Sequence, residues 1–132
     1  MDKKSVVIVG GTVVMIVAVL AGLYWNRQTV PVNDAVPGTI AITGVSLVTA
    51  ILFGAVARLR ATLIALIVGS ALAAGALLDA TIHFFVPPET ANLFPFVVIA
   101  LGVMGALAGL VGGLLGQGIV RLLGSAESSG GR

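Results

Sequence analysis

Residues 93–123 read LFPFVVIALGVMGALAGLVGGLLGQGIVRLL, an apolar run that contains no charged residue before Arg121. Its glycines recur at intervals of three and four residues, as on one helical face, at Gly102, Gly105, Gly109, Gly112 and Gly116. Gly105, Gly109 and Gly113 also form two overlapping GxxxG steps. An interior glycine costs a helix in water about 1 kcal/mol relative to alanine, whereas in lipid it lets a neighbouring helix approach closely. We therefore predict a membrane-spanning helix over residues 93–120 with a glycine-lined packing face.

The composition of the whole chain excludes an ordinary soluble domain. Its 132 residues are 58% hydrophobic and 9% charged, with a mean hydropathy of +1.17, whereas soluble domains carry about 25% charged residues. The net charge of +2 rests on too few basic residues to indicate a nucleic-acid partner. The absence of cysteine excludes disulfides and thiolate metal ligands. We expect one transmembrane domain over residues 1–124, partnered by the lipid bilayer and by other membrane subunits or copies of itself.

Three further apolar runs predict spans over residues 5–24, 39–57 and 62–82. The first ends at Tyr24 and Trp25, an aromatic pair typical of the headgroup level. Arg58 and Arg60 separate the second run from the third without a proline or glycine. A continuous helix over residues 40–85 would be about 69 Å long, over twice the thickness of the hydrocarbon core, so the chain must reverse near Arg58. The predicted fold is therefore all-α, an integral membrane four-helix bundle.

The first apolar run allows a second interpretation, as a cleavable signal. The first apolar run is about 20 residues long, the length of a full span, whereas the apolar region of a cleavable signal has about 7–15 residues. We therefore interpret residues 5–24 as a retained span. Residues 125–132 are rich in serine and glycine and are predicted to form a disordered cytoplasmic tail.

Small and hydroxyl side chains indicate how the spans pack. In the third predicted span, small residues recur every four positions at Ala61, Ala65, Gly69 and Ala73. Such small-xxx-small steps are typical of helix–helix contacts in membranes, so this surface is the expected partner of the glycine face. In the second span, a stripe of Thr39, Thr43, Ser46 and Thr49 either packs against a neighbouring helix or lines a permeation route. Packing is the commoner use of such hydroxyls and is the interpretation we favour.

The distribution of basic residues predicts the orientation. With four spans, one side of the membrane carries Lys3, Lys4, Arg58, Arg60, Arg121 and Arg132, and the other side carries only Arg27. Because short cytoplasmic segments are enriched in Lys and Arg, both termini are expected on the cytoplasmic side of the plasma membrane.

Asp79 and His83 are the candidate ion or proton site, since they lie four residues apart on one helical face. Ionisable residues inside a membrane are costly and commonly functional. Asp79 is about 27 Å along the helix from Ala61, however, near the outer boundary of a hydrocarbon core about 30 Å thick. A structural or water-reachable pair at the helix end is therefore favoured, and a proton site is the alternative.

No enzymatic chemistry is indicated. One histidine and one aspartate are too few for a catalytic zinc site, which needs about three protein ligands. Ser46 and Ser70 have no base near them in the sequence, and no GxSxG motif occurs. The glycines of residues 93–123 match neither a phosphate loop nor a dinucleotide-binding fingerprint. We expect no cofactor, no metal and no enzymatic activity.

In length the chain is similar to small multidrug transporters, double-barrelled fluoride channels and holins. Membership of the small multidrug transporters would require an acidic residue in the first span, and residues 5–24 contain none. The polar, phenylalanine-rich pore motifs of the fluoride channels are absent. The charged tail of holins is matched only by Arg121, Glu127 and Arg132. None of these families is therefore assigned.

Two hypotheses for the function follow. The first is a small multi-pass membrane protein that acts by helix packing, as an accessory or assembly subunit or a homo-oligomeric scaffold. The second is a small channel or transporter that uses Asp79 and His83 together with the hydroxyls of residues 39–57. The small-residue faces and the scarcity of buried chemistry favour the first.

Overall fold

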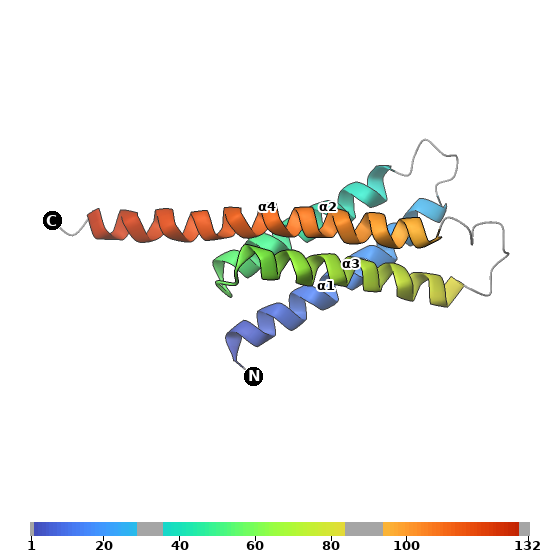
Figure 1. The fold of residues 1–132 in the computed structure, drawn as a ribbon, viewed down its shortest axis with the longest axis horizontal. Helices are drawn as coiled ribbons and strands as arrows, with labels where there is room; N and C mark the ends of the chain where they lie inside the picture. Colours follow the sequence, from blue (N-terminus) through green and yellow to red (C-terminus); the bar gives the residue numbers. More distant parts are fainter. Residues whose placement is uncertain (1, 29–35, 84–93, 130–132) are drawn as a thin grey trace.

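The computed structural model describes residues 2–28, 36–83 and 94–129, and these form four helices (Figure 1). The helices are α1 (Lys3–Gln28), α2 (Val36–Ala55), α3 (Ala61–His83) and α4 (Phe94–Ser129). Each contains a stretch of 18 or more residues that is apolar enough to cross a membrane. The predicted all-α fold with four candidate membrane spans is confirmed.

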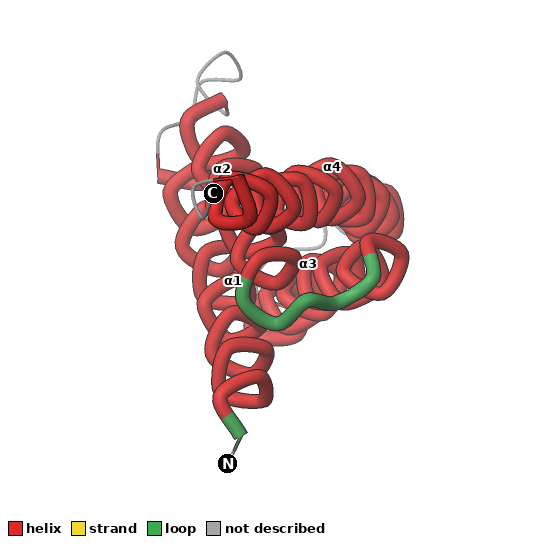
Figure 2. Tube along the Cα trace, turned by 90° about the vertical axis from the view of Figure 1, so that its left-hand side faces the viewer, coloured by secondary structure: helices red, strands yellow, loops and turns green. Residues whose placement is uncertain are grey.

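The helices pack side by side, with α1 and α4 on opposite sides of α2 and α3. Helix α4 lies along α3 and α2, and α1 also contacts both of these helices. No Cα atom of α1 comes within 8 Å of one in α4 across the described residues. Figure 2 shows α1 and α4 leaving the bundle in different directions. Helices α2 and α3 therefore lie between α1 and α4 and pack against both.

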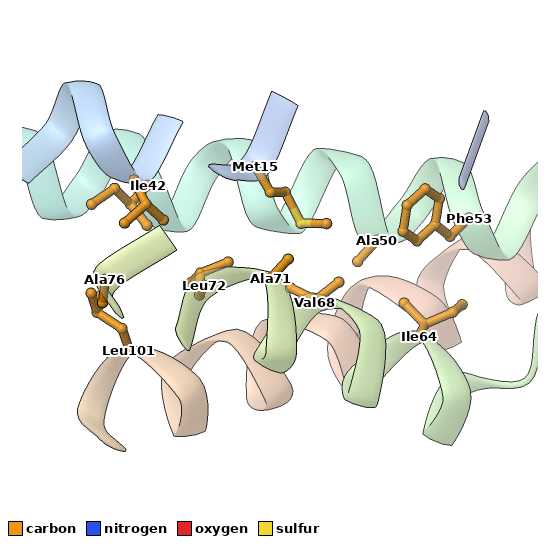
Figure 3. Packing of buried hydrophobic residues seen from close by; sticks show 11 residues of the cluster. Met15, Ile42, Ala50, Phe53, Ile64, Val68, Ala71, Leu72, Ala76 and Leu101 are labelled. Carbon is orange, nitrogen blue, oxygen red and sulfur yellow. The ribbon is translucent and has the colours of Figure 1, made fainter. Parts of the chain in front are cut away.

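The buried apolar side chains come almost entirely from α1, α2 and α3 (Figure 3). They are Met15 and Val19; Ile42, Ala50 and Phe53; and Ile64, Val68, Ala71, Leu72 and Ala76. Helix α4 adds only Leu101 to this cluster. Large interdigitating side chains therefore pack the first three helices, whereas α4 meets its neighbours mainly through smaller residues.

The reversal between α2 and α3 depends on Arg58, whose φ of 52° lies in the left-handed region. The turn closes with hydrogen bonds from the Val56 N–H to the Leu52 carbonyl (2.8 Å) and from the Leu59 N–H to the Phe53 carbonyl (3.3 Å). Glycine is the usual residue in this conformation after a helix, because it has no Cβ to clash. Because an arginine and not a glycine takes this position, the sequence contains no turn residue here, and only the length of the apolar runs located the reversal.

Several helix boundaries differ from those predicted, and the start of α2 and the end of α4 are the two that need a physical explanation. Helix α2 begins at Val36, so Pro37 and Gly38 lie in its first turn and not before it. A proline is tolerated there because N–H groups in the first turn have no acceptor within the helix.

Helix α4 continues past the predicted span to Ser129, through most of the segment expected to be a tail. Leu122, Leu123 and Ala126 favour helix, and extending an existing helix adds one hydrogen bond per ordered residue. With 36 residues, α4 is about 54 Å long, well over the hydrocarbon thickness. Its C-terminal end accordingly extends beyond the other helices in Figure 1. Residues 29–35, 84–93 and 130–132 lie outside the described residues.

Candidate functional site

The GxxxG glycines of α4 lie directly against the backbone of α3. A Cβ atom added at Gly109 would lie 2.7 Å from the Ala65 Cα atom and 3.0 Å from the Ile64 carbonyl oxygen. An added Cβ at Gly105 would lie 3.1 Å from the Gly69 Cα atom, and at Gly113 the nearest backbone atom is the Ala61 Cα at 3.2 Å. At Gly109 an added Cβ would therefore force the two helices to shift, and at Gly105 and Gly113 its backbone contacts would be tighter than nine in ten real Cβ contacts.

Two other glycines of α4 lie against α2, and both belong to the row with three- and four-residue spacing. An added Cβ at Gly112 would lie 2.6 Å from the Ala50 Cβ atom and 2.9 Å from the Leu47 carbonyl oxygen. At Gly116 it would lie 3.1 Å from the Gly54 Cα atom. The row at three- and four-residue spacing therefore divides between two neighbouring helices, whereas the sequence pointed to the third span alone.

Gly102, at the other end of the row, is less tightly enclosed. An added Cβ there would lie 3.6 Å from the Ala73 Cβ atom, which is ordinary van der Waals contact. The backbones of α3 and α4 are nevertheless close here, because an added Cβ at Gly69 would lie 2.9 Å from the Gly102 carbonyl oxygen.

Several close contacts were missed by the sequence analysis, and Gly54 is the most important. An added Cβ at Gly54 would lie 2.7 Å from the Gly113 carbonyl oxygen of α4. Its four-residue spacing from Ala50 is a small-xxx-small step that could have been recognised. Two glycines of α1 instead face large side chains of α2: Gly11 meets the Phe53 ring, and Gly22 meets Ile42.

The hydroxyl stripe of α2 is hydrogen-bonded to its own helix. Thr43 donates to the Thr39 carbonyl (2.8 Å), Ser46 to the Ile42 carbonyl (2.7 Å) and Thr49 to the Val45 carbonyl (2.8 Å). Thr43 Oγ1 also lies 3.5 Å from Met104 Sδ of α4. Among the described residues, no buried side-chain nitrogen or oxygen lacks a hydrogen-bond partner. The stripe is therefore compatible with a packed surface between helices.

Gln117 connects α4 to the α2–α3 turn. Its Nε2 atom donates a hydrogen bond to the Leu59 carbonyl at 2.7 Å. The carbonyls of a turn have no regular helical donor, and leaving them unpaired in a low-dielectric environment is costly. Gln117 therefore stabilises the Arg58 reversal from a different helix.

Asp79 is buried, with 5% of its surface exposed. It lies one helical turn after Gly75, where an added Cβ would be 2.9 Å from the Val19 Cβ atom of α1. The sequence favoured a structural or water-reachable carboxylate at the helix end, and the burial of Asp79 is compatible with the structural option. His83 is the last residue of α3, and its side chain lies outside the described residues. Their pairing stays a prediction.

Residues 2–28, 36–83 and 94–129 contain no group of three His, Cys, Asp or Glu side chains arranged to hold a metal ion. In comparisons with known proteins, no family, curated protein or solved structure matches this chain.

Proposed function

We propose that this chain is a non-enzymatic multi-pass protein of the cell membrane that acts by helix packing, as an accessory or assembly subunit or as a homo-oligomeric scaffold. The observation that supports it best is the close approach of Gly105, Gly109 and Gly113 to the backbone of α3. Gly112 and Gly116 approach α2 in the same way. These contacts bring the backbone of α4 against both neighbouring helices.

The physical basis is that lipid supplies little hydrophobic force between helices, because the lipid tails are as apolar as the side chains. Association then depends on van der Waals packing, which increases as two backbones approach. The Gly/Ala contacts between α3 and α4 and between α2 and α4 provide that packing. The hydroxyls of Ser46 and Thr49 support the same interpretation, since they bond to their own helix and leave no polar lining.

The proposal is tested by reconstituting the purified chain in proteoliposomes and by measuring its mass in mild detergent. We expect proton and ion flux no greater than in protein-free vesicles, together with a stable complex containing a partner or further copies. Flux well above the protein-free value from a strictly monomeric chain contradicts the proposal.

The proposed orientation has both termini in the cytoplasm. Lys3 at the start of α1, the arginines of the α2–α3 turn and Arg121 on α4 all belong to the same end of the bundle, which bears the chain termini and the turn in Figure 1. This clustering follows the tendency of cytoplasmic segments to carry Lys and Arg.

We predict that reporter fusions after Arg60 and after Arg132 give cytoplasmic signals, and that a fusion after Asp34 gives an external signal. The physical reason is the six-to-one distribution of basic residues between the two sides. Reporters active on only one side of the membrane, such as alkaline phosphatase outside and a fluorescent protein inside, make the measurement. An external signal at Arg60 would show that the four-span arrangement is wrong.

One observation favours the second candidate, a small transporter: the burial of Asp79 within a membrane-spanning helix. Carboxylates in such positions commonly belong to proton or ion pathways. Under this candidate, Asp79 and His83 form the site and the protein supports pH-dependent flux.

We expect Asp79→Asn to leave both thermal stability and any measurable flux close to the wild type. Asparagine keeps the shape of the side chain and one of its two acceptor oxygens, and a neutral group is cheaper to bury than a carboxylate. Thermal unfolding in detergent and flux from proteoliposomes are the two measurements. Normal stability with complete loss of a flux that the wild type shows would establish the transporter.

A further inference from the structure

An apolar groove of about 580 Å³ lies between α1 and α2 on the outside of the bundle. Val6, Gly10 and Val14 form one wall, and Gly44, Val48 and Leu52 form the other. The valines and the leucine are about half exposed, so the groove is open to whatever surrounds the bundle. Its volume is within the range of about 300–1,000 Å³ typical of small-molecule sites.

Two glycines make this groove different from the other helix contacts. Cβ atoms added at Gly10 and Gly44 would meet nothing within 4 Å, whereas those added at Gly109 or Gly54 would collide with backbone. Gly10 and Gly44 therefore leave space that no part of this chain fills. The groove lies beside the contact between Gly11 of α1 and the Phe53 ring of α2, and these two residues also line it.

One end of the groove is basic. Lys3 precedes Val6 and Val7 by three and four residues and is exposed, so it lies on the groove side of α1, one turn beyond the apolar lining. Lys4 is the next residue, and Asp2 is the one acidic residue in this N-terminal segment, so the segment carries a net positive charge. The α2–α3 turn, with Arg58 and Arg60 exposed, lies at this same end of the bundle in Figure 1.

We propose that the α1–α2 groove binds one acyl chain of an anionic phospholipid and that Lys3 contacts the phosphate of its headgroup. An apolar channel about as long as two to three helical turns, with a cation at its membrane-surface end, matches a molecule that has an apolar tail and an anionic head. Basic residues next to a membrane span attract anionic lipids, and basic sites between spans bind their headgroups. The lipid belongs to the leaflet that the basic end of the bundle faces.

The test uses the purified full-length chain in detergent, stripped of lipid and then incubated with dioleoyl phosphatidylglycerol or with dioleoyl phosphatidylcholine. Native mass spectrometry measures the bound lipid. We expect one phosphatidylglycerol retained per chain and weaker retention of phosphatidylcholine. Lys3→Gln should lower the affinity for phosphatidylglycerol about fivefold, the effect of one basic side chain at an anionic surface.

Gly44→Leu should abolish retention of both lipids, since its Cβ meets nothing within 4 Å and the rest of the side chain takes up space in the groove. Two matched controls should bind as the wild type does. Gly118→Leu changes a glycine that also has open space around it but lies outside the groove, and Arg121→Gln removes a basic charge from α4. Thermal unfolding verifies that each variant is folded.

Two outcomes overturn the proposal. The first is equal retention of the two lipids by the wild type, and the second is unchanged retention by a folded Gly44→Leu variant. If that variant also loses an oligomer that the wild type forms, the groove holds a helix of a second copy and not a lipid.

Discussion

Replacing Gly109 with leucine is expected to lower the free energy of unfolding by about 1–3 kcal/mol, the usual cost of overpacking. A Cβ alone would lie 2.7 Å from the Ala65 Cα atom, and the rest of the leucine side chain has no space between α3 and α4. Backbone atoms cannot rotate away as a side chain can, so the two helices must separate. A thermal-stability assay in detergent measures the effect as a lower unfolding temperature.

Val111→Leu is the matched control for this prediction. Val111 lies on the same helix two residues further on, and 53% of its surface is exposed, so a larger side chain extends into lipid. We expect its unfolding temperature to equal that of the wild type. Equal destabilisation of the two variants would mean that Gly109 is not at a tight helix contact.

The second large effect is expected from Gln117→Met, which should lower the free energy of unfolding by about 1–3 kcal/mol. Methionine keeps the length and much of the volume of glutamine but cannot donate to the Leu59 carbonyl, which is 2.7 Å from Nε2 in the wild type. That carbonyl belongs to the turn in which Arg58 already adopts a left-handed conformation. Loss of the bond therefore affects the α2–α3 reversal and the position of α4 together.

Leu114→Met on the same helix controls for the general effect of methionine, since Leu114 is 61% exposed and has no comparable role. Thermal unfolding in detergent should show a lower unfolding temperature for Gln117→Met alone. Limited proteolysis gives a second measurement, with faster cleavage near Arg58 and Arg60 expected in the same variant. A Gln117→Met variant as stable as the wild type would show that the hydrogen bond does not support the turn.

Residue spacing predicts which side chains of the candidate site share a helical face, but it does not predict what covers that face. The four-residue interval between Asp79 and His83 places both on one side of α3, and this requires only helical periodicity. Whether Asp79 faces water or protein depends on which helix covers that side. The distance of Asp79 from the start of the helix favoured a structural or water-reachable position near the membrane boundary. In the fold, Val19 of α1 lies beside Gly75, one turn before Asp79, and Asp79 is buried.

The sequence by itself determined the four apolar helices and the need for a reversal near Arg58, because hydropathy and length are properties of each segment alone. It also located the glycines of α4, since helical periodicity places them on one side. Only the tertiary structure decided that Gly105, Gly109 and Gly113 meet α3 while Gly112 and Gly116 meet α2. A glycine has no side chain whose size or polarity could specify a partner, so its neighbour is set by how the helices cross. The same reason applies to Gly10 and Gly44, which resemble packing glycines in the sequence but border an open groove in the fold.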